Sequence, residues 1–489
     1  MLARTLVEGD NIALFCVREQ HPGEFRMKAR RQGGLDEDSR RLLDQMVRNR
    51  LSAESEVSAP QQANEPPAAA PDGAMDFQNL PGYRELKLQR SMAALVGLDN
   101  PYFRLHETAA GATTIIGGRQ YINYSSYDYL GLNQHPEVRA AAQAAIDQFG
   151  TSASASRLVA GERPLHQELE KALAGHYGQE DCAVFVSGHA TNVSTIGAIV
   201  GPKDLIVHES LAHNSIIAGA TLSRAERRSF PHNDSEALDA LLRSLRHQFE
   251  RVLIVVEGLY SMDGDIPDLP NVIEIKRRHN CWLMVDEAHG LGVLGEKGFG
   301  LFEHFGCDPR DVDIWMGTLS KTLAACGGFI AGSTALVEFL KCFSGGFVYS
   351  VGLSPPLAAA AKAALAILHR EPARVEKLRL IGRRFYDMAK ARGWDTGTSA
   401  GRAIIPIMAG NSVRAVALSQ KLFERGINVQ PIIHPAVPER AARLRFFLTS
   451  EHRAGQIDHT IEAIALSMTA ISEDPVLQNI PGFNSSGPA

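Results

Sequence analysis

Gly317-Thr318-Leu319-Ser320-Lys321 is the most informative stretch of this chain, and Val285-Asp286-Glu287-Ala288-His289-Gly290 precedes it. The first stretch places a lysine after two hydroxyl side chains and before the small residues 324–328. The second ends an apolar run, Trp282 to Val285, with an acid and a histidine. A cofactor with an aldehyde group requires a lysine to hold it, a carboxylate to keep a pyridine nitrogen protonated, and hydroxyl or amide groups for a phosphate. Together the two stretches predict a site for pyridoxal 5'-phosphate.

Length and composition are those of a soluble enzyme. At 489 residues the chain exceeds one ordinary domain, so two packed domains with appendages are expected. Hydrophobic residues make up 45% and charged residues 21%, and the net charge of −5 argues against a nucleic-acid-binding surface. The six scattered cysteines, without a C-x-x-C pair, indicate reduced thiols and a cytoplasmic location. Neither a signal peptide nor an apolar run of about 18 residues is found, so we expect no transmembrane segment.

Five regions follow from the sequence: an N-terminal appendage with linker (1–75), an N-terminal arm of the enzyme (76–125), a large cofactor-binding domain (126–360), a small C-terminal domain (361–475) and a tail (476–489). Within the appendage, 35–51 has apolar residues at helical spacing, and 52–74 is a linker rich in Ala, Pro, Ser, Glu and Gln. The appendage is either a tail without a partner or a docking element, for example for an acyl carrier protein. A remnant carrier domain is disfavoured because no Asp-Ser-Leu-type attachment serine occurs.

Short apolar runs alternate with helical patterns along the large domain. The expected strands are 119–123, 182–187, 204–208, 252–257, 281–286 and 314–317, and the expected helices are 83–95, 135–149, 235–249, 269–279 and 357–368. This alternation predicts an α/β fold with a mostly parallel central sheet and helices on both faces. Ligands bind such sheets at the carboxyl ends of the strands, where both opening stretches lie.

Three further candidates also follow expected strands. Ser187–Asn192 opens a helix, so the backbone amides of Gly188 and His189 can bind a phosphate, although an ordinary strand-to-helix turn would use the same residues. His213 is placed to lie flat on a cofactor ring, whereas a lone histidine is often structural. Ser261 offers a hydroxyl near the ring, unless its segment is only a glycine-containing turn.

The opening stretches supply the remaining candidates. Asp286 would raise the basicity of the pyridine nitrogen through its opposite charge, unless it is a buried acid with a salt partner. His289 can reach the phenolic oxygen of the ring, and Thr318 is placed to reach the phosphate. No metal site is expected, because no third ligand lies at a recognisable spacing.

From about Tyr83 to Ile471 the chain resembles the α-oxoamine synthases, a family of pyridoxal-phosphate-dependent acyltransferases. The motifs that carry the resemblance occur in order: Ser125–Leu132, Ser156–Gly161, the segment around His213, Glu257–Gly264, Asp286–Gly290, Thr318–Lys321 and Arg443–Arg445. The resemblance implies an aspartate-aminotransferase-like fold of type I, with a smaller α+β C-terminal domain. It also implies a homodimer with shared active sites.

Roles carried over from the family give Lys321 as the lysine that binds the cofactor, Asp286 as the partner of the ring nitrogen and His213 as the stacking residue. These three are the expected catalytic residues. The other expected cofactor contacts are Gly188, His189, Ser261, His289, Thr318 and Ser350, and the expected substrate contacts are Arg445, Tyr127 and Arg104.

The implied reaction joins a small amino acid to an acyl thioester of coenzyme A or an acyl carrier protein, with loss of carbon dioxide, to give an α-amino ketone. The chain differs from the biotin-pathway member of the family, 8-amino-7-oxononanoate synthase, in two places. Tyr127 stands where that enzyme has an asparagine, and His434-Pro435-Ala436-Val437-Pro438 stands where it has an Arg-Pro-Pro-Thr-type loop. In both places the chain looks more like serine palmitoyltransferases and polyketide-synthase-associated members. Losing that arginine removes a partner for the distal carboxylate of a pimeloyl-type donor. Serine and a long acyl chain, as in sphingolipid biosynthesis, are therefore expected. The alternative is an enzyme similar to 8-amino-7-oxononanoate synthase or another member that uses glycine or alanine.

Three other interpretations stay open at this point. A different pyridoxal-phosphate reaction, such as amino transfer, would not need the Ser125–Leu132 and Arg443–Arg445 motifs. A catalytically inactive regulatory subunit would lack Lys321. A scaffold would bind partners through the appendage.

Overall fold

The computed structural model describes residues 73–84, 86, 87, 90 and 97–478, which form two units that meet between Tyr83 and Arg84. The first unit contributes the short 3₁₀ helix η1 (Phe77–Asn79). The helix expected over 35–51, the linker as far as residue 72, and the tail after Gln478 lie outside the described residues, as does part of the helix expected over 83–95. Among the residues that the structure describes, no helix has the length and apolar character needed to cross a membrane.

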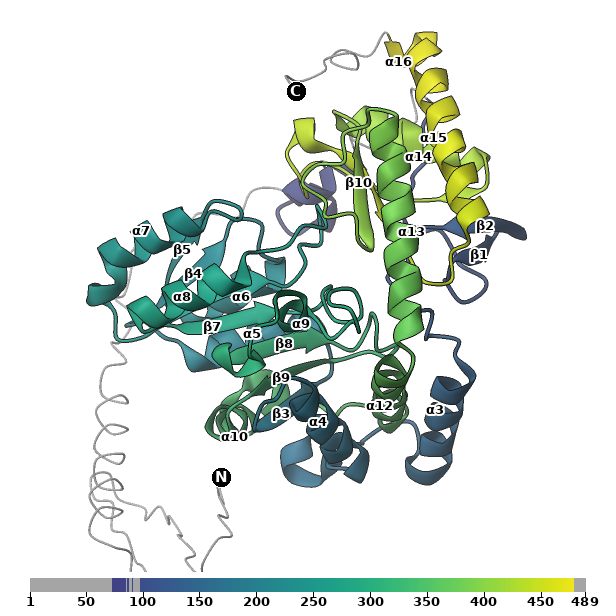
Figure 1. The fold of residues 1–489 in the computed structure, drawn as a ribbon. Helices are drawn as coiled ribbons and strands as arrows, with labels where there is room; N and C mark the ends of the chain where they lie inside the picture. The colour runs from purple at the N-terminus through teal and green to yellow at the C-terminus, as the bar shows by residue number, and fades with distance from the viewer. Residues whose placement is uncertain (1–72, 85, 88–89, 91–96, 479–489) are drawn as a thin grey trace, which may run out of the picture. The chain divides into compact units, whose positions relative to one another are not determined.

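A seven-stranded sheet forms the centre of the second unit (Figure 1). Its strands, in order across the sheet, are β3 (Asp181–Phe185), β9 (Gly328–Gly332), β8 (Ile314–Thr318), β7 (Trp282–Asp286), β6 (Val252–Glu257), β4 (Leu205–Glu209) and β5 (Glu226–Phe230). Strands β8, β7, β6, β4 and β5 are parallel, whereas β9 runs antiparallel to both of its neighbours. The predicted mostly parallel α/β sheet is confirmed.

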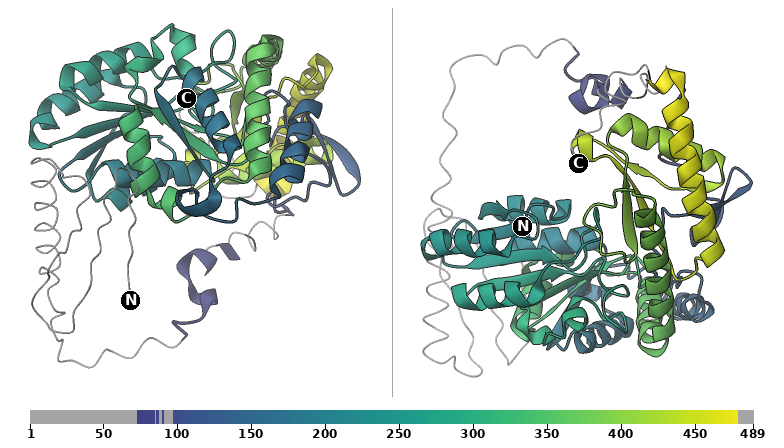
Figure 2. Two further views of the ribbon diagram at one scale, coloured as in Figure 1. Left: turned by 90° about the horizontal axis from the view of Figure 1, so that it is seen from below. Right: turned by 45° about the horizontal axis from the view of Figure 1, so that its top comes forward.

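Strands β4, β6 and β8 are buried on both faces, which explains why they read as continuous apolar runs. In β6, Val252, Ile254 and Val256 belong to one core cluster, and Leu253 and Val255 belong to another. The first cluster is completed by α4 (Pro164–His176), α7 (Ser235–Leu245) and α8 (Leu269–His279), and the second by α5 (Gly188–Ile199), α6 (Asn214–Ser223) and α10 (Thr334–Phe343). Figure 2 shows helices covering the sheet on both sides. Each fully buried aliphatic side chain contributes about 1.5–3 kcal/mol.

The remaining elements of this part are short or flank the sheet: α3 (Pro136–Phe149), the π-turn η2 (Arg157–Gly161), η3 (Arg246–Gln248), α9 (Leu301–Phe305), η4 (Pro309–Asp311) and α11 (Gly345–Val348). Helix α12 (Pro355–Arg370), which includes the predicted Ala- and Leu-rich helix, packs against α3 and α4. After Glu371 the chain continues as α13 (Pro372–Ala391), which packs against α15 (Ala454–Glu473). Helices α12 and α13, which follow one another in the chain, connect the sheet to the C-terminal part (Figure 1).

Two three-stranded sheets belong to the C-terminal part. One consists of β10 (Ile404–Met408), β13 (Arg443–Phe447) and β12 (Pro431–Ile432), and the other of β1 (Thr113–Ile116), β2 (Arg119–Asn123) and β11 (Ile427–Asn428). Because β2 pairs in parallel with β11, the segment assigned to an N-terminal arm joins this part of the molecule. Helices α14 (Ser412–Glu424), α15 and α16 (Pro475–Gln478) and the turn η5 (Glu439–Ala441) complete it.

Outside the central sheet, the strands β1, β10, β11, β12 and β13 have no counterpart among the expected strands, and within the central sheet β5 and β9 have none. β5 (Glu-Arg-Arg-Ser-Phe) is an edge strand whose charged side chains face solvent, so it lacks an apolar pattern. β9 (Gly-Phe-Ile-Ala-Gly) is short and begins and ends with glycine, which sequence patterns associate with turns. The helix expected over 235–249 is α-helical only to Leu245 and tightens into η3.

Candidate active site

The carboxyl ends of β6, β7 and β8 and the first turns of α5 and α6 surround one cavity of about 320 Å³. The side chains that line it come from segments far apart in the sequence: Tyr127, Ser187, Gly188, His189, Asn192, His213, Ser215, Glu257, Asp286, Ala288, His289, Met316, Thr318, Ser320, Lys321, Cys326 and Gly327. Seven of the predicted cofactor residues and Tyr127 are among them. The position agrees with the rule that open α/β sheets bind ligands at their strand ends.

Lys321 lies just after β8 with its ammonium group in this cavity. Nζ is 5.5 Å from the centre of the Tyr127 ring, and in the described part of the chain no acceptor lies within hydrogen-bond or ion-pair distance of it. Burial lowers the pKa of Lys321, against the opposing charges of Asp286 and Glu257. A lower pKa increases the fraction of neutral amine, which is the form that attacks an aldehyde.

Asp286, the last residue of β7, presents a carboxylate that is buried but only partly used. Its Oδ2 accepts a hydrogen bond from Asn192 Nδ2 (2.8 Å), and Oδ1 accepts one from the backbone N–H of Ala288 (3.0 Å). Both bonds stabilise the ionised form, and each oxygen retains a lone pair. The carboxylate can therefore accept a further bond from a protonated ring nitrogen.

His213 is the N-cap residue of α6, and three contacts fix it. Its backbone N–H donates to Glu257 Oε1 (2.7 Å), while its Nδ1 lies 2.7 Å from Ser215 Oγ and 3.2 Å from the backbone nitrogen of Ser215. Burial lowers the pKa of His213, although the charge of Asp286 opposes this. At neutral pH the ring is therefore an uncharged face beside the lysine.

His289 is held from behind by Tyr129, whose hydroxyl lies 2.6 Å from His289 Nδ1. Both side chains are buried, and burial lowers the pKa of His289 well below its usual range and raises that of Tyr129. With Nδ1 occupied, His289 has its other nitrogen for the cavity. This agrees with the predicted contact to a ring oxygen, which stays a prediction.

Two backbone amides at the start of α5 are without a protein partner in the part of the chain that the structure describes. Ser187 caps the helix by accepting from the backbone N–H of Ala190 (3.1 Å), and the two amides are those of Gly188 and His189. A Cβ added to Gly188 would lie 2.9 Å from Thr318 Oγ1, so only glycine lets the two segments come this close. Thr318 in turn contacts Ser320 Oγ (2.7 Å) and donates to the carbonyl of Gly327 (3.0 Å). Unpaired amides at a helix N-terminus beside hydroxyl groups suit a phosphate.

Four predicted residues do not line this cavity: Ser261, Arg104, Ser350 and Arg445. Ser261 contributes its carbonyl, which accepts from Arg445 Nη1 (2.8 Å). Arg104 donates to Asn428 Oδ1 (2.9 Å) and lies 3.6 Å from the centre of the Phe423 ring, where burial lowers its pKa to about 10.

Ser350 follows α11 and is half-buried away from the cavity. Its contact with a cofactor remains a prediction, as do those of Ser261 and Arg104.

Arg445 on β13 is half-buried, and its guanidinium lies 4.6 Å from the centre of the Phe447 ring. Its Nε is buried and has no partner within the described ranges, and burial lowers its pKa. The neighbouring Arg443, in contrast, is paired with Asp263. Arg445 is thus the member of the Arg443–Arg445 motif that can still bind a carboxylate.

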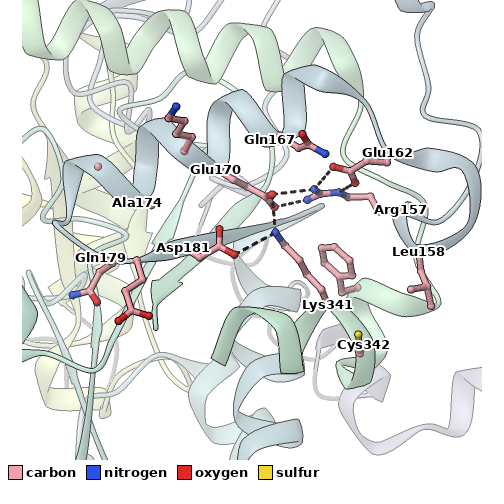
Figure 3. A pocket seen from close by; sticks show the side chains of 14 residues that line it. Arg157, Leu158, Glu162, Gln167, Glu170, Ala174, Gln179, Asp181, Lys341 and Cys342 are labelled. Atoms are coloured by element: carbon pink, nitrogen blue, oxygen red, sulfur yellow. Dashed lines mark hydrogen bonds and ion pairs between the residues drawn. The ribbon is translucent and has the colours of Figure 1, made fainter. Parts of the chain in front are cut away.

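The motif Ser156–Gly161 serves a different cavity, of about 720 Å³, shown in Figure 3. Arg157 forms ion pairs with Glu162 (2.6 Å) and Glu170, and Lys341 bonds to Glu170 (3.0 Å) and approaches Asp181 (3.9 Å). None of its lining residues lines the cavity of Lys321. We interpret this motif as structural.

Four residues outside the predicted set bond through their side chains to predicted site residues: Tyr129, Asn192, Ser215 and Glu257. Each lies within or next to a motif that the sequence did single out. What the sequence could not show is that Asn192 on α5 reaches Asp286 on β7, since this depends on tertiary packing.

The unpaired lysine, the open Asp286 carboxylate and the free amides fit pyridoxal 5'-phosphate, and comparisons with known proteins agree. The model of the aminotransferase class I and II family matches residues 119–464. 8-Amino-7-oxononanoate synthases from Thermoanaerobacter pseudethanolicus and Beijerinckia indica are 38% and 40% identical to the chain over 357 and 359 residues, or 73% of this chain and 90% of each relative.

Solved structures show the same relationship. The serine palmitoyltransferase of Sphingomonas wittichii is 31% identical, with a TM-score of 0.77 over 82% of this chain and 100% of its own. An 8-amino-7-oxononanoate synthase from Francisella tularensis is 26% identical, with a TM-score of 0.62 over 72% and 99%. The fold is thus the predicted type I fold of pyridoxal-phosphate enzymes. The chain belongs to the aminotransferase class I and II family and, within it, to the pyridoxal-phosphate-dependent α-oxoamine synthases.

Proposed function

We propose that this chain condenses a small amino acid with an acyl thioester, releasing carbon dioxide and forming an α-amino ketone. The observation that carries the proposal is the arrangement of Lys321, Asp286, His213 and His289 around one cavity. Pyridoxal phosphate, when bound, supplies an aldehyde for amines and a ring that withdraws electrons.

Lys321 has two tasks in this reaction. Its Nζ would hold the cofactor, and the same Nζ as a neutral amine would remove the proton from the α-carbon of the substrate. Its lowered pKa suits the second task, because a base acts best when it is neutral near the working pH. General base catalysis of this kind contributes roughly 10²–10⁴-fold.

Arg445 is proposed to bind the carboxylate of the amino acid. A guanidinium with an unpaired Nε can form a charge-assisted bond, and the contact to the Ser261 carbonyl fixes its direction. His213 lies beside Lys321 and limits the orientation of the bound amino acid, and Tyr127 covers Nζ from another side.

For the substrates we propose an enzyme of the 8-amino-7-oxononanoate synthase type, in preference to the serine and long-chain donor expected from the sequence. Eight sequence relatives with that name are 36–40% identical to the chain. Among solved structures, the serine palmitoyltransferases are 27–31% identical and the 8-amino-7-oxononanoate synthase from Francisella tularensis is 26% identical. One observation favours the second candidate. His434, which stands in the loop where the arginine was expected, is exposed and offers no fixed cation for a distal carboxylate.

A substrate screen tests both candidates. Purified protein with pyridoxal phosphate is incubated with glycine, alanine or serine and with pimeloyl and palmitoyl thioesters, and products are identified by mass. A higher kcat/KM for the pimeloyl thioester supports the first candidate. If efficiency instead rises with apolar chain length, at about 0.8 kcal/mol per buried methylene, the second is correct. Absence of any α-amino ketone would contradict the proposed function.

We propose in addition that two copies assemble, since Ser350 does not reach the cavity of its own chain while its neighbours Tyr349 and Val351 are exposed. Mass measurement in solution tests this.

Docking of a carrier protein by residues 1–75 is also a proposal. Deleting residues 1–75 should then raise KM for a carrier-bound donor and leave KM for the coenzyme A thioester unaffected, whereas equal effects on both donors would contradict it.

A further inference from the structure

We infer that Asn192 and Ser215 are positioning residues that hold His213 in one tautomer, with its proton on Nε2 and that N–H available to the cavity. The inference rests on the proposed place of His213 beside the cofactor. Its test does not depend on turnover, so the two can fail separately.

The chain of contacts starts at Asp286. Asn192 uses both hydrogens of Nδ2, one for Asp286 Oδ2 (2.8 Å) and one for Ser215 Oγ (2.9 Å). The reverse amide orientation would place Oδ1 against the carboxylate, so the charge of Asp286 selects this one. Asn192 is buried and its Oδ1 has no partner in the described structure, which shows that the orientation is kept although one acceptor stays unused.

Ser215 passes this orientation on to His213. Since the hydroxyl oxygen accepts from Asn192, its own hydrogen is free to donate to His213 Nδ1, 2.7 Å away. The backbone N–H of Ser215 points at the same nitrogen from 3.2 Å. The backbone N–H cannot turn away, so a proton on Nδ1 would meet its hydrogen, and the Ser215 hydroxyl completes the arrangement by donating to Nδ1. The ring must accept at Nδ1 and carry its proton on Nε2.

Nε2 has no protein partner among the described residues, and the ring lines the cavity. The fixed tautomer gives the site an uncharged donor for an oxygen of the substrate. It adds no second cation beside Lys321. The other charged and titratable groups around His213 act in both directions and do not by themselves choose a tautomer: His189, Glu257, Asp286, Lys321 and Arg445.

The direct test uses the unmodified chain without cofactor. Nitrogen-15 NMR of ring-labelled histidine, with the His213 signals assigned by their loss in His213→Gln, reports which nitrogen is protonated. We expect a protonated Nε2 and an unprotonated Nδ1. Protonation at Nδ1 would overturn the inference.

A second test measures how the hydrogen bonds of Asn192 and Ser215 affect the protonation of His213. We call these two residues the relay. Deuterium exchange at the imidazole C2, followed by mass spectrometry, gives a pH midpoint for each histidine. Ser215→Ala removes a donor to Nδ1, and Asn192→Ala removes the hydrogen bond that orients the Ser215 hydroxyl toward Nδ1. Both should raise the His213 midpoint by roughly half a pH unit or more.

Thr195→Val is the matched control, because Thr195 lies on the same helix with a buried hydroxyl that has no partner in the described ranges. It should leave the midpoint unchanged. The inference is wrong if both relay variants keep the midpoint of the unmodified chain, or if Thr195→Val shifts it equally.

Discussion

The cavity of Lys321 and the cavity of Arg157 lie on the same domain but treat their charged groups in opposite ways. The charges in contact with Arg157 are paired: the guanidinium contacts Glu162 and Glu170, and Lys341 also bonds to Glu170 (Figure 3). Lys321 has no partner, and neither do the amides at the start of α5, among the described residues.

We interpret the paired charges around Arg157 as groups that stabilise the fold, and the unpaired groups around Lys321 as groups available to bind a ligand. A buried polar group without a partner costs free energy, so folded proteins keep such groups mainly where something else will bind. A saturated ion-pair network offers nothing further to bind, but removing one member leaves a buried charge uncompensated. Mutations in the cavity of Lys321 should therefore change the catalytic activity, and mutations in the cavity of Arg157 should change the free energy of unfolding.

Lys321→Ala should have the largest effect of all on activity. Without Nζ there is neither a covalent anchor for the cofactor nor a base for the α-proton, and product formation should fall by roughly 10⁴-fold or more. Thermal stability of the cofactor-free protein should not fall, since Lys321 makes no ion pair in the described part of the chain. Product formation by mass and melting by circular dichroism measure the two. A variant that keeps its activity would contradict the assignment of Lys321.

Asp286→Asn should keep the cofactor bound and yet slow α-proton exchange by roughly 10²-fold or more, because a neutral amide cannot hold the ring nitrogen protonated. Deuterium incorporation at the α-carbon of the bound amino acid measures the step without requiring an acyl donor. Visible absorbance of the bound cofactor is the control for occupancy. Exchange at the parent rate would make Asp286 a purely structural residue.

Glu170→Gln should have the opposite profile. The substitution removes the charge that both Arg157 and Lys341 bond to, and breaking a buried pair of this kind costs about 3–5 kcal/mol. The kcat of the folded fraction should stay close to that of the parent, because none of these residues lines the other cavity. Urea denaturation and initial rates measure the two effects. A large fall in kcat with unchanged stability would reverse the comparison.

Sequence patterns predicted those parts of the fold that depend on local burial. The strands buried on both faces and the helix over 269–279 have regular apolar patterns, and the structure has them where expected. Strands β5 and β9 lack such patterns because one is a charged edge and the other is bounded by glycine. Their formation depends on neighbours in the sheet.

The site divides in the same way. Lys321, Asp286, His213 and Gly188 each follow a strand or open a helix, so their convergence at one edge could be expected from the order of elements alone. Tyr129 could not, because it contacts His289 across 160 positions of the sequence through packing that no local pattern encodes.

Glu287 is an intermediate case between the two cavities, because it has no ion pair in the part of the chain that the structure describes and does not line the cavity of Lys321. We expect a smaller effect on stability from it. It is fully buried next to Asp286, its Oε1 accepts from the backbone N–H of Leu301 (2.7 Å), and its Oε2 has no partner within the described residues. Burial raises its pKa from 4.5 to about 8. The folded protein therefore holds a proton on Glu287 that the unfolded chain has released, and stability should fall as pH rises from about 4.5 to about 8.

Each pH unit in that window costs about 1.4 kcal/mol for one proton, so Glu287 should account for a loss of about 2–3 kcal/mol between pH 6 and 8. Glu287→Gln keeps the shape and the acceptor for Leu301 but cannot ionise, and its stability should decline less over the same range. Urea denaturation at both pH values measures the difference, and contributions from other titrating groups cancel because both proteins contain them. Parallel stability losses would show that Glu287 is already ionised in the folded state, stabilised by a partner that its present contacts do not include.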